Sequence, residues 1–547
     1  MKANDTTIRI YLEGSKQFIV PLFQRTYSWR RENLQRLWDD IVETGSDPNT
    51  AHFFGSFVTF PIPSAASGVS KYVIIDGQQR LVTAFIFLSV LRNRIIEIKP
   101  DYVKRDEVHE LYLINKYHPD GKYKVVPTQA DREILFRIIE EPTYQTDGEH
   151  LIQDSFNFFK GQLSAMSDLD LLLSLKDALL LRFYVVDIKL DNNDDPYLIF
   201  ESLNATGTPL TQADLIRNYL FMRTDQDIQQ DIYDKVWLPM QQRLRDYLED
   251  FVRHYLAMGG NIPAYSKIYA TFKDNADHVA ESSEDVVTKM RELSKYSNYY
   301  SKFLQPKDEA DESLRQYLGK FKKIEVTTSY PLLLNLYDDY ANNRISNKQL
   351  LECLKTIEAY VVRRSVCGIA AQALNRYFPT VYKSINKADI SISLKNTLRE
   401  ASGAQRMPTD EEFRQCLTER NLYGTRILKY ILEQIENYDN KETVDFSKLQ
   451  IEHIMPQTLS DEWETMLGNN WELVHQKYLD NLGNLTLTGY NPEYSNKSFI
   501  EKRDTENGFT QSRLRLNSYL AKLNSWNEEE IKKRAGKLAE KALKIWA

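Results

Sequence analysis

Residues 71–91 read KYVIIDGQQRLVTAFIFLSVL. The first part, rich in Val and Ile, is typical of a buried β-strand, and the apolar positions after Arg80 recur at helical spacing. The polar residues from Asp76 to Arg80 lie between the two. The sequence therefore predicts a strand, a tight turn at Gly77 and a long helix, and the free N–H groups at the start of that helix favour an anion such as a phosphate.

The flanking sequence extends this unit into an α+β domain. An amphipathic helix is expected over about 31–44, strands over 54–60 and 71–76 with a turn-rich loop between them, and a buried strand within 179–190. A further helix is predicted after Thr211, with Asp214 at its third position as a capping partner. We place this first domain at residues 1–225.

The rest of the chain divides into a helical region and a C-terminal unit. Residues 226–404 show helical patterning without an internal repeat, and ASGAQRMPTD at 401–410 indicates a surface loop. We place the third domain at residues 405–547. The fold class is thus α+β and multidomain, and the central helices either connect the two ends or provide a surface for a homodimer.

The composition excludes several classes of protein. With 70 basic and 77 acidic residues the net charge is −7, which argues against a protein that coats nucleic acid through bulk charge. The three cysteines lack C-x-x-C spacing, so neither a disulfide framework nor a thiolate zinc site is expected. The strongest apolar run, residues 81–91, is too short to span a bilayer. A cytoplasmic protein without a membrane segment is predicted.

The C-terminal unit carries the clearest catalytic pattern. Residues 452–457 read EHIMPQ, so that His453 follows Glu452 at the end of a predicted strand. A neutral imidazole takes a proton from water near pH 7, and an adjacent carboxylate can hold a divalent metal. LGNLTL at 482–487 then predicts a tight turn, and NKSF at 496–499 the start of a helix. The pattern favours a metal-dependent hydrolase over a core histidine beside a turn asparagine.

These three pieces resemble the ββα-metal (HNH) nuclease fold, and in particular the C-terminal domain of GmrSD-type modification-dependent restriction enzymes. The resemblance implies His453 as the general base, Glu452 and Asn496 as metal ligands, Asn484 as the residue that braces the loop, and Lys502, with Arg503, near the scissile phosphate. Asparagine instead of histidine at position 496 favours Mg²⁺ or Mn²⁺ over zinc.

The N-terminal motif DGQQR, residues 76–80, suggests a second site. Arg80 is suited to pair with a phosphate and Asp76 to hold Mg²⁺ or orient water, while Gly77 permits close approach and Gln78 and Gln79 offer contacts to base, ribose or phosphate. The chain contains no Walker motif. The alternative is structural: Asp76 caps the helix, and the other side chains make local bonds.

The segments FQRTYSW at 23–29, HFFGS at 52–56, DGQQRL at 76–81 and FESLN at 200–204 resemble, in order, the N-terminal domain of the same GmrSD-type proteins. That resemblance implies a ParB/sulfiredoxin-like fold that binds and hydrolyses a nucleoside triphosphate, with Gln24 and Arg25 completing the pocket. Tyr27 and Trp29 either stack on a base or pack in the core. Thr83 stands where the ParB pattern has alanine, so the preferred nucleotide stays open.

Together the two resemblances predict a phage-defence endonuclease that cleaves modified double-stranded DNA and is regulated by nucleoside triphosphate. An NTP-driven conformational regulator with a minor or vestigial nuclease is the alternative. RNA as the substrate is disfavoured, because nothing in the sequence resembles an RNA-binding module with aromatic strands.

Overall fold

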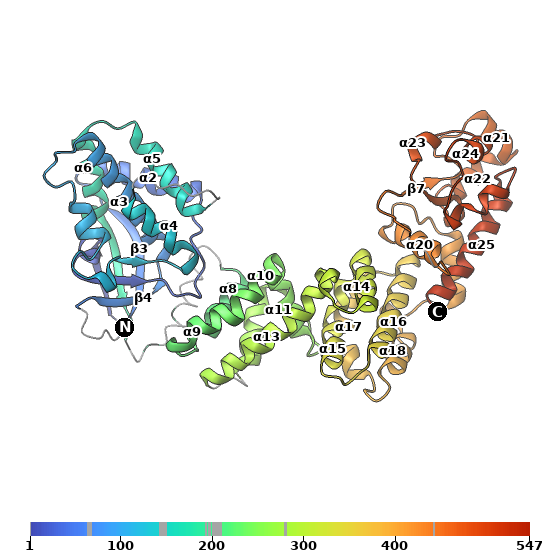
Figure 1. Ribbon diagram of the computed structural model, residues 1–547, viewed down its shortest axis with the longest axis horizontal. Coiled ribbons are helices and arrows are strands. Elements are labelled where there is room, and N and C mark those ends of the chain that lie inside the picture. The colour runs from blue at the N-terminus through green and yellow to red at the C-terminus, as the bar shows by residue number, and fades with distance from the viewer. Residues whose placement is uncertain are drawn as a thin grey trace. The chain divides into compact units, whose positions relative to one another are not determined.

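The computed structural model describes residues 2–62, 68–141, 150–191, 194, 199, 210–277, 282–440 and 444–547. The chain divides into two compact units, which are drawn in Figure 1. The N-terminal unit comprises Met1–Pro239 and Tyr269–Glu292, and the C-terminal unit comprises Met240–Ile268 and Leu293–Ala547. The predicted α+β multidomain class is confirmed at this level. The predicted motif FESLN at 200–204 lies outside the described residues.

The N-terminal unit is built on a mixed six-stranded sheet with the order β1-β6-β3-β4-β2-β5. Its strands are β1 (Lys2–Thr7), β2 (Lys16–Ile19), β3 (His52–Ile62), β4 (Ser70–Asp76), β5 (Val125–Val126) and β6 (Phe183–Lys189). The pairs β1/β6 and β3/β4 are antiparallel, whereas β3/β6, β2/β4 and β2/β5 are parallel. The strands expected over 54–60, 71–76 and within 179–190 are therefore confirmed.

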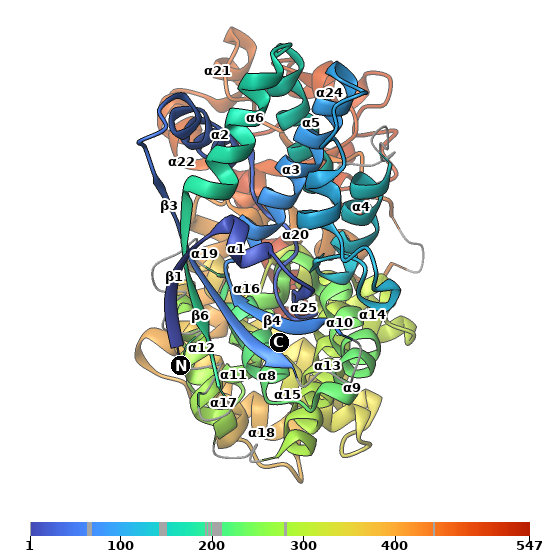
Figure 2. The same ribbon diagram turned by 90° about the vertical axis from the view of Figure 1, so that its left-hand side faces the viewer.

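Alternation along the strands separates two apolar layers. Phe57 and Ile74 belong to the large core, whereas their neighbours Val58 and Ile75 belong to a smaller cluster on the other side. Successive strand side chains point to opposite faces, so the sheet is covered on both. Figure 2 shows helices gathered beside these strands. The large core includes residues of α1 (Ile8–Leu12), α2 (Arg31–Ser46), α3 (Gln78–Ile98), α4 (Gln129–Glu140), α5 (Leu151–Ser164) and α6 (Leu169–Asp177).

The helix predicted after Thr211 is α8 (Gln212–Met222), and the Thr211 side chain accepts from the backbone N–H of Asp214, as the capping pattern predicted. Helix α8 supplies residues to the smaller apolar cluster. The N-terminal unit also contains α9 (Gln226–Ile232), most of α12 (Ile268–Asp277) and the first part of α13 (Ser283–Leu304).

The C-terminal unit is mainly helical. Its first helices are α10 (Leu238–Leu244), α11 (Leu248–Ala257), α14 (Glu312–Ile324), α15 (Tyr330–Ala341), α16 (Asn347–Val366), α17 (Leu374–Ser384) and α18 (Ile390–Arg399). Its later helices are α19 (Asp410–Glu419), α20 (Arg426–Asn437), α21 (Asp461–Leu467), α22 (Trp471–Tyr478), α23 (Asn491–Tyr494), α24 (Phe499–Asp504) and α25 (Glu528–Ile545). In both units, none of the helices that the structure describes is long and apolar enough to span a membrane.

An antiparallel pair of short strands lies within these helices. In β7 (Gln450–His453) and β8 (Leu485–Thr488), Glu452 faces Thr486 and His453 faces Leu485. A short 3₁₀ turn at Leu482–Asn484 leads into β8, and the Ser498 side chain caps α24 through a capping box with Glu501. The predicted order of strand, turn and helix is thus confirmed, but the turn is shorter than expected, because Leu485–Leu487 belong to strand β8.

His254 on α11 makes the stability of the C-terminal unit dependent on pH. Its side chain is buried, Nδ1 lies 3.0 Å from the Tyr300 hydroxyl, and burial lowers the pKa of His254 to about 4. The unfolded chain then binds a proton near pH 6.5 that the folded chain excludes. We expect the free energy of unfolding to fall by about 2 kcal/mol through this residue as the pH drops from 7 to 5. In His254→Gln this contribution of about 2 kcal/mol to the pH dependence should be absent. Urea titrations of both proteins at the two pH values measure it, and an equal loss in both would contradict the assignment.

Candidate nucleotide pocket and nuclease centre

The junction of β4 and α3 forms the floor of a cavity of about 550 Å³. Gly77 is the N-cap residue of α3 and has φ +95°, in the left-handed region that favours glycine. A Cβ atom here would lie 2.3 Å from the Phe57 ring. No side chain caps the helix, so in the described part of the chain the first-turn N–H groups of Gln78 and Gln79 have no acceptor and are available to a ligand.

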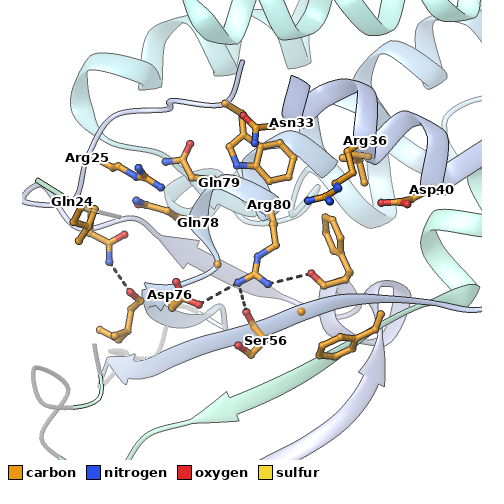
Figure 3. A pocket seen from close by; sticks show the side chains of 18 of the residues that line it. Gln24, Arg25, Asn33, Arg36, Asp40, Ser56, Asp76, Gln78, Gln79 and Arg80 are labelled. Atoms are coloured by element: carbon orange, nitrogen blue, oxygen red, sulfur yellow. Dashed lines mark hydrogen bonds and ion pairs between the residues drawn. The ribbon is translucent and has the colours of Figure 1, made fainter. Parts of the chain in front are cut away.

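Arg80 is bound within the protein rather than directed at a ligand. Its guanidinium donates to the carbonyls of Phe54 (3.1 Å) and Ser56 (2.8 Å) and pairs with Asp76 at 3.1 Å (Figure 3). A Cβ atom on Gly55, which has φ +107°, would lie 1.6 Å from Nη1 of Arg80. Arg80 therefore ties β3 to the β4–α3 junction. Arg80 thus makes the local bonds of the structural alternative rather than the expected bidentate pairing with phosphate, and Asp76 pairs with Arg80 instead of capping the helix.

Two of the three predicted glutamines of the cavity, Gln24 and Gln79, also make internal bonds. Gln24 is buried and donates to the carbonyls of Ile74 and Ile75 at 2.8 and 3.0 Å. Gln79 is buried, accepts from the backbone N–H of Ser28 at 2.8 Å and donates to the Thr26 carbonyl at 3.3 Å. These bonds fasten the 24–28 segment to β4 and α3. Both side chains line the cavity, but their amide groups are engaged in these internal bonds.

Two arginines of the cavity wall have no such partners. Arg25 is half-buried. Burial lowers the pKa of its guanidinium, and the negative charges of Asp214 and Asp76 oppose this shift. Arg36 on α2 is exposed; sequence analysis missed it because an exposed helical arginine carries no motif. Among the described residues neither side chain makes a hydrogen bond or ion pair. Figure 3 shows Arg25 beside Gln78 and Arg36 on the other side of Arg80.

The aromatic residues of the 23–29 segment pack in the core. Tyr27 is buried, and its hydroxyl lies 2.7 Å from the Thr83 hydroxyl, which itself donates to the Gln79 carbonyl. This bond gives Thr83 a role that alanine could not fill. Trp29 packs partly against the large core and also lines the cavity.

A second cavity, of about 330 Å³, lies at the end of β7. Glu452, His453 and Asn496 line it, as predicted, together with Asn491, which sequence analysis missed. Asn491 starts α23, a four-residue helix. The cavity is lined by one carboxylate, by the carboxamides of Gln450, Gln457, Asn491 and Asn496 and by the Ser495 hydroxyl, so the chemistry of the site suits a hard cation that keeps several of its waters. No group of three His, Cys, Asp or Glu side chains fit to hold a metal is found among the described residues.

His453 is held by a carboxylate that the sequence motif does not contain. Its Nε2 lies 2.9 Å from Oδ1 of Asp480, and the ring of Tyr423 packs edge-on at 4.3 Å between centroids. Burial lowers the pKa of His453, and the bond to Asp480 opposes that shift. The imidazole is therefore neutral near pH 7, with its Nε2–H donated to Asp480. In the described part of the chain Nδ1 has no hydrogen-bond partner and is the nitrogen able to accept a proton.

Lys502 lies beneath the strand instead of facing the cavity. Its side chain is fully buried, and Nζ donates to Oε1 of Glu452 at 2.7 Å and to the His453 carbonyl at 2.8 Å. Burial lowers the pKa of Lys502 and raises that of Glu452, while their pairing opposes both shifts. This differs from the expected place near a scissile phosphate. Arg503 also points elsewhere, to Asp504 and to the Leu523 carbonyl.

Asn484 braces the turn that follows His453. Its side chain is fully buried: Oδ1 accepts from the Met455 N–H at 2.8 Å and from the Trp526 indole at 3.0 Å, and Nδ2 donates to the carbonyls of Met455 and Leu479. It does not line the cavity. The bracing role implied by the resemblance therefore fits its surroundings, whereas a direct part in the reaction does not.

Thermal unfolding distinguishes the two kinds of arginine in the first cavity. Arg80→Ala leaves two carbonyls and the Asp76 carboxylate without their donor, so we expect the Tm of the N-terminal unit to fall by roughly 4–10 °C. Arg36→Ala, the matched control in the same cavity, is expected to change Tm by no more than about 1 °C because it breaks no bond. Calorimetry of the ligand-free protein measures both, and equal Tm values would show that Arg80 is not a structural residue.

Comparison with protein families relates both sites to known domains. Residues 8–221 match the model of the GmrSD restriction endonuclease N-terminal domain, and residues 407–541 match that of the C-terminal domain. The two cavities fall within these two matches. No curated protein matches the chain. With both domains present in the order that the sequence motifs predicted, the chain belongs to the GmrSD restriction endonuclease family.

Proposed function

We propose that the chain cleaves modified double-stranded phage DNA at the cavity around His453 and that nucleoside triphosphate, bound and hydrolysed at the first cavity, regulates this cleavage. The family supports the endonuclease activity and a role in restriction. The observation that carries the assignment of the nuclease centre is the His453–Asp480 bond beside a wall of oxygen donors. In this proposal β7, β8 and α24 form the ββα-metal element, and the six-stranded sheet carries a ParB/sulfiredoxin-like nucleotide domain.

His453 acts as the general base. Asp480 accepts the Nε2 proton and so fixes the tautomer in which Nδ1 carries the lone pair. Nδ1 takes a proton from a water molecule, whose oxygen then bonds to phosphorus as the bond from phosphorus to the leaving ribose oxygen breaks. The Tyr423 ring packs against the imidazole and limits its rotation, and Asn484 holds the turn that follows His453.

Glu452 and Asn496 would hold Mg²⁺ or Mn²⁺, with Asn491 near enough to contribute its carboxamide. When bound, the ion neutralises charge on the phosphate and on the leaving oxygen. Lys502 positions the Glu452 carboxylate through Oε1 and leaves Oε2 without a hydrogen bond among the described residues. A single carboxylate predicts weak binding of the ion in the absence of DNA.

Substitution of the base and of its partner tests the nuclease centre. We expect His453→Ala to lower the rate of DNA cleavage by about 10²–10⁴-fold, and Asp480→Asn by about 10–10²-fold because the carboxamide no longer selects the tautomer. His118→Ala, a histidine of the N-terminal unit, serves as the control and should cleave like the wild type. The assay measures cleavage of a labelled duplex under single-turnover conditions. Full activity of His453→Ala would remove this residue from the mechanism.

Regulation by nucleotide is tested on the unaltered protein with Mg²⁺. Each of the four nucleoside triphosphates is added in turn to paired modified and unmodified DNA, and both DNA cleavage and phosphate release are followed. We expect cleavage of the modified DNA to change with at least one nucleotide, and phosphate release to persist in His453→Ala. Cleavage that is indifferent to every nucleotide, with no phosphate released, would contradict the regulatory part of the proposal.

A further inference from the structure

Asn218 places a buried hydrogen-bond acceptor without a donor at the wall of the first cavity. The residue lies on α8, is 1% exposed and lines the cavity together with Gln24 and Arg25. Its Oδ1 has no hydrogen-bond partner among the described residues. A buried carbonyl left unpaired costs about 1–3 kcal/mol, so such groups are rare and are typical of places where a ligand supplies the partner.

A neighbouring arginine holds Asn218 in place. Arg217 donates to the carbonyl of Phe23 and pairs with Asp214 at 2.6 Å. Helix α8 is thereby fastened to the segment that leads into Gln24 and Arg25. The acceptor is therefore fixed relative to the cavity before any ligand arrives, as a recognition group requires.

A second acceptor at the cavity has the same property. Oε1 of Gln78, the first residue of α3, is buried and without a hydrogen-bond partner among the described residues. Phosphate groups near neutral pH offer acceptors and almost no donors, so they cannot satisfy these oxygens. Ribose hydroxyls and the amino or imino groups of a base are donors that can.

The groups suited to phosphate are different ones. Arg25 and Arg36 offer guanidinium groups without internal partners, and the first-turn N–H groups of α3 have no cap. Cations and free N–H groups bind phosphate oxygens, whereas they repel donors. The cavity thus contains acceptors for one part of a nucleotide and cations for the other.

We propose that Asn218 is a nucleoside-recognising residue: its Oδ1 accepts a hydrogen bond from the ribose or the base, while Arg36 and Arg25 take the phosphates. This inference rests on the proposed nucleotide site and extends it to a residue outside the DGQQR motif. It explains why α8 is fastened to the cavity wall through Arg217.

Calorimetric titration of the full chain with each nucleoside triphosphate, between roughly 50 and 300 mM KCl, tests whether Asn218 binds the nucleoside and the arginines bind the phosphates. Asn218→Leu keeps a similar volume and removes the acceptor. We expect it to weaken binding of the preferred nucleotide by about 5–30-fold and to leave the salt dependence of Kd unchanged. Arg36→Ala, the matched variant at the phosphate groups, is expected to weaken binding and to make the salt dependence shallower, because a charge contact is lost.

The ligand-free variants supply the control for folding. Removing an unpaired buried acceptor should leave the Tm of Asn218→Leu equal to that of the wild type or higher. If leucine prevents folding, Asn218→Ser carries the same test, because its hydroxyl is too short to reach the same position. Unchanged affinity, or a shallower salt dependence like that of Arg36→Ala, would overturn the role of Asn218 alone. A wild-type protein that binds none of the four nucleotides would overturn the nucleotide site itself.

Discussion

The N-terminal cavity depends on one half-buried contact, that of the Arg80 guanidinium, which occupies the space beside Gly55. Its bonds to Phe54, Ser56 and Asp76 join the first part of β3 to the turn between β4 and α3. The left-handed turn at Gly77 and the uncapped start of α3 lie next to this contact in the chain. A cavity with free N–H groups at its floor follows from it, and the side chains left to meet a ligand are those that Arg80 does not engage.

The nuclease centre repeats this arrangement with a lysine. Lys502 lies under β7 and holds both the Glu452 carboxylate and the His453 carbonyl, as Arg80 holds Asp76 and two carbonyls. In each unit one basic residue binds backbone carbonyls near a strand end and pairs with a carboxylate of the motif, and other groups remain free for the ligand. Asp480 and Arg36, both outside the motifs, complete the two sites.

The sequence predicted the elements well because their signals are local. Runs rich in β-branched and aromatic residues marked β3, β4 and β6, and the Thr211 cap marked α8. Strand β1 was missed, since its six residues KANDTT, all polar except Ala3, carry no apolar alternation and its place in the sheet comes from pairing with the distant β6. For Arg80 the structural alternative of local bonds is the one observed, and the role of Lys502 was missed; neither could be fixed from the sequence, because their partners include backbone carbonyls, which no sequence pattern displays. Asp480 escaped for a related reason: its contact with His453 spans a segment containing α21 and α22.

A structure of the protein with a non-hydrolysable nucleoside triphosphate in the N-terminal cavity shows directly whether Arg80 stays a structural residue while other groups bind the phosphates. We expect the phosphates to lie over the N–H groups of Gln78 and Gln79 and to contact Arg25 and Arg36, while Arg80 keeps its bonds to Phe54 and Ser56. A structure in which the Arg80 guanidinium leaves those carbonyls to bind the phosphates would contradict this expectation.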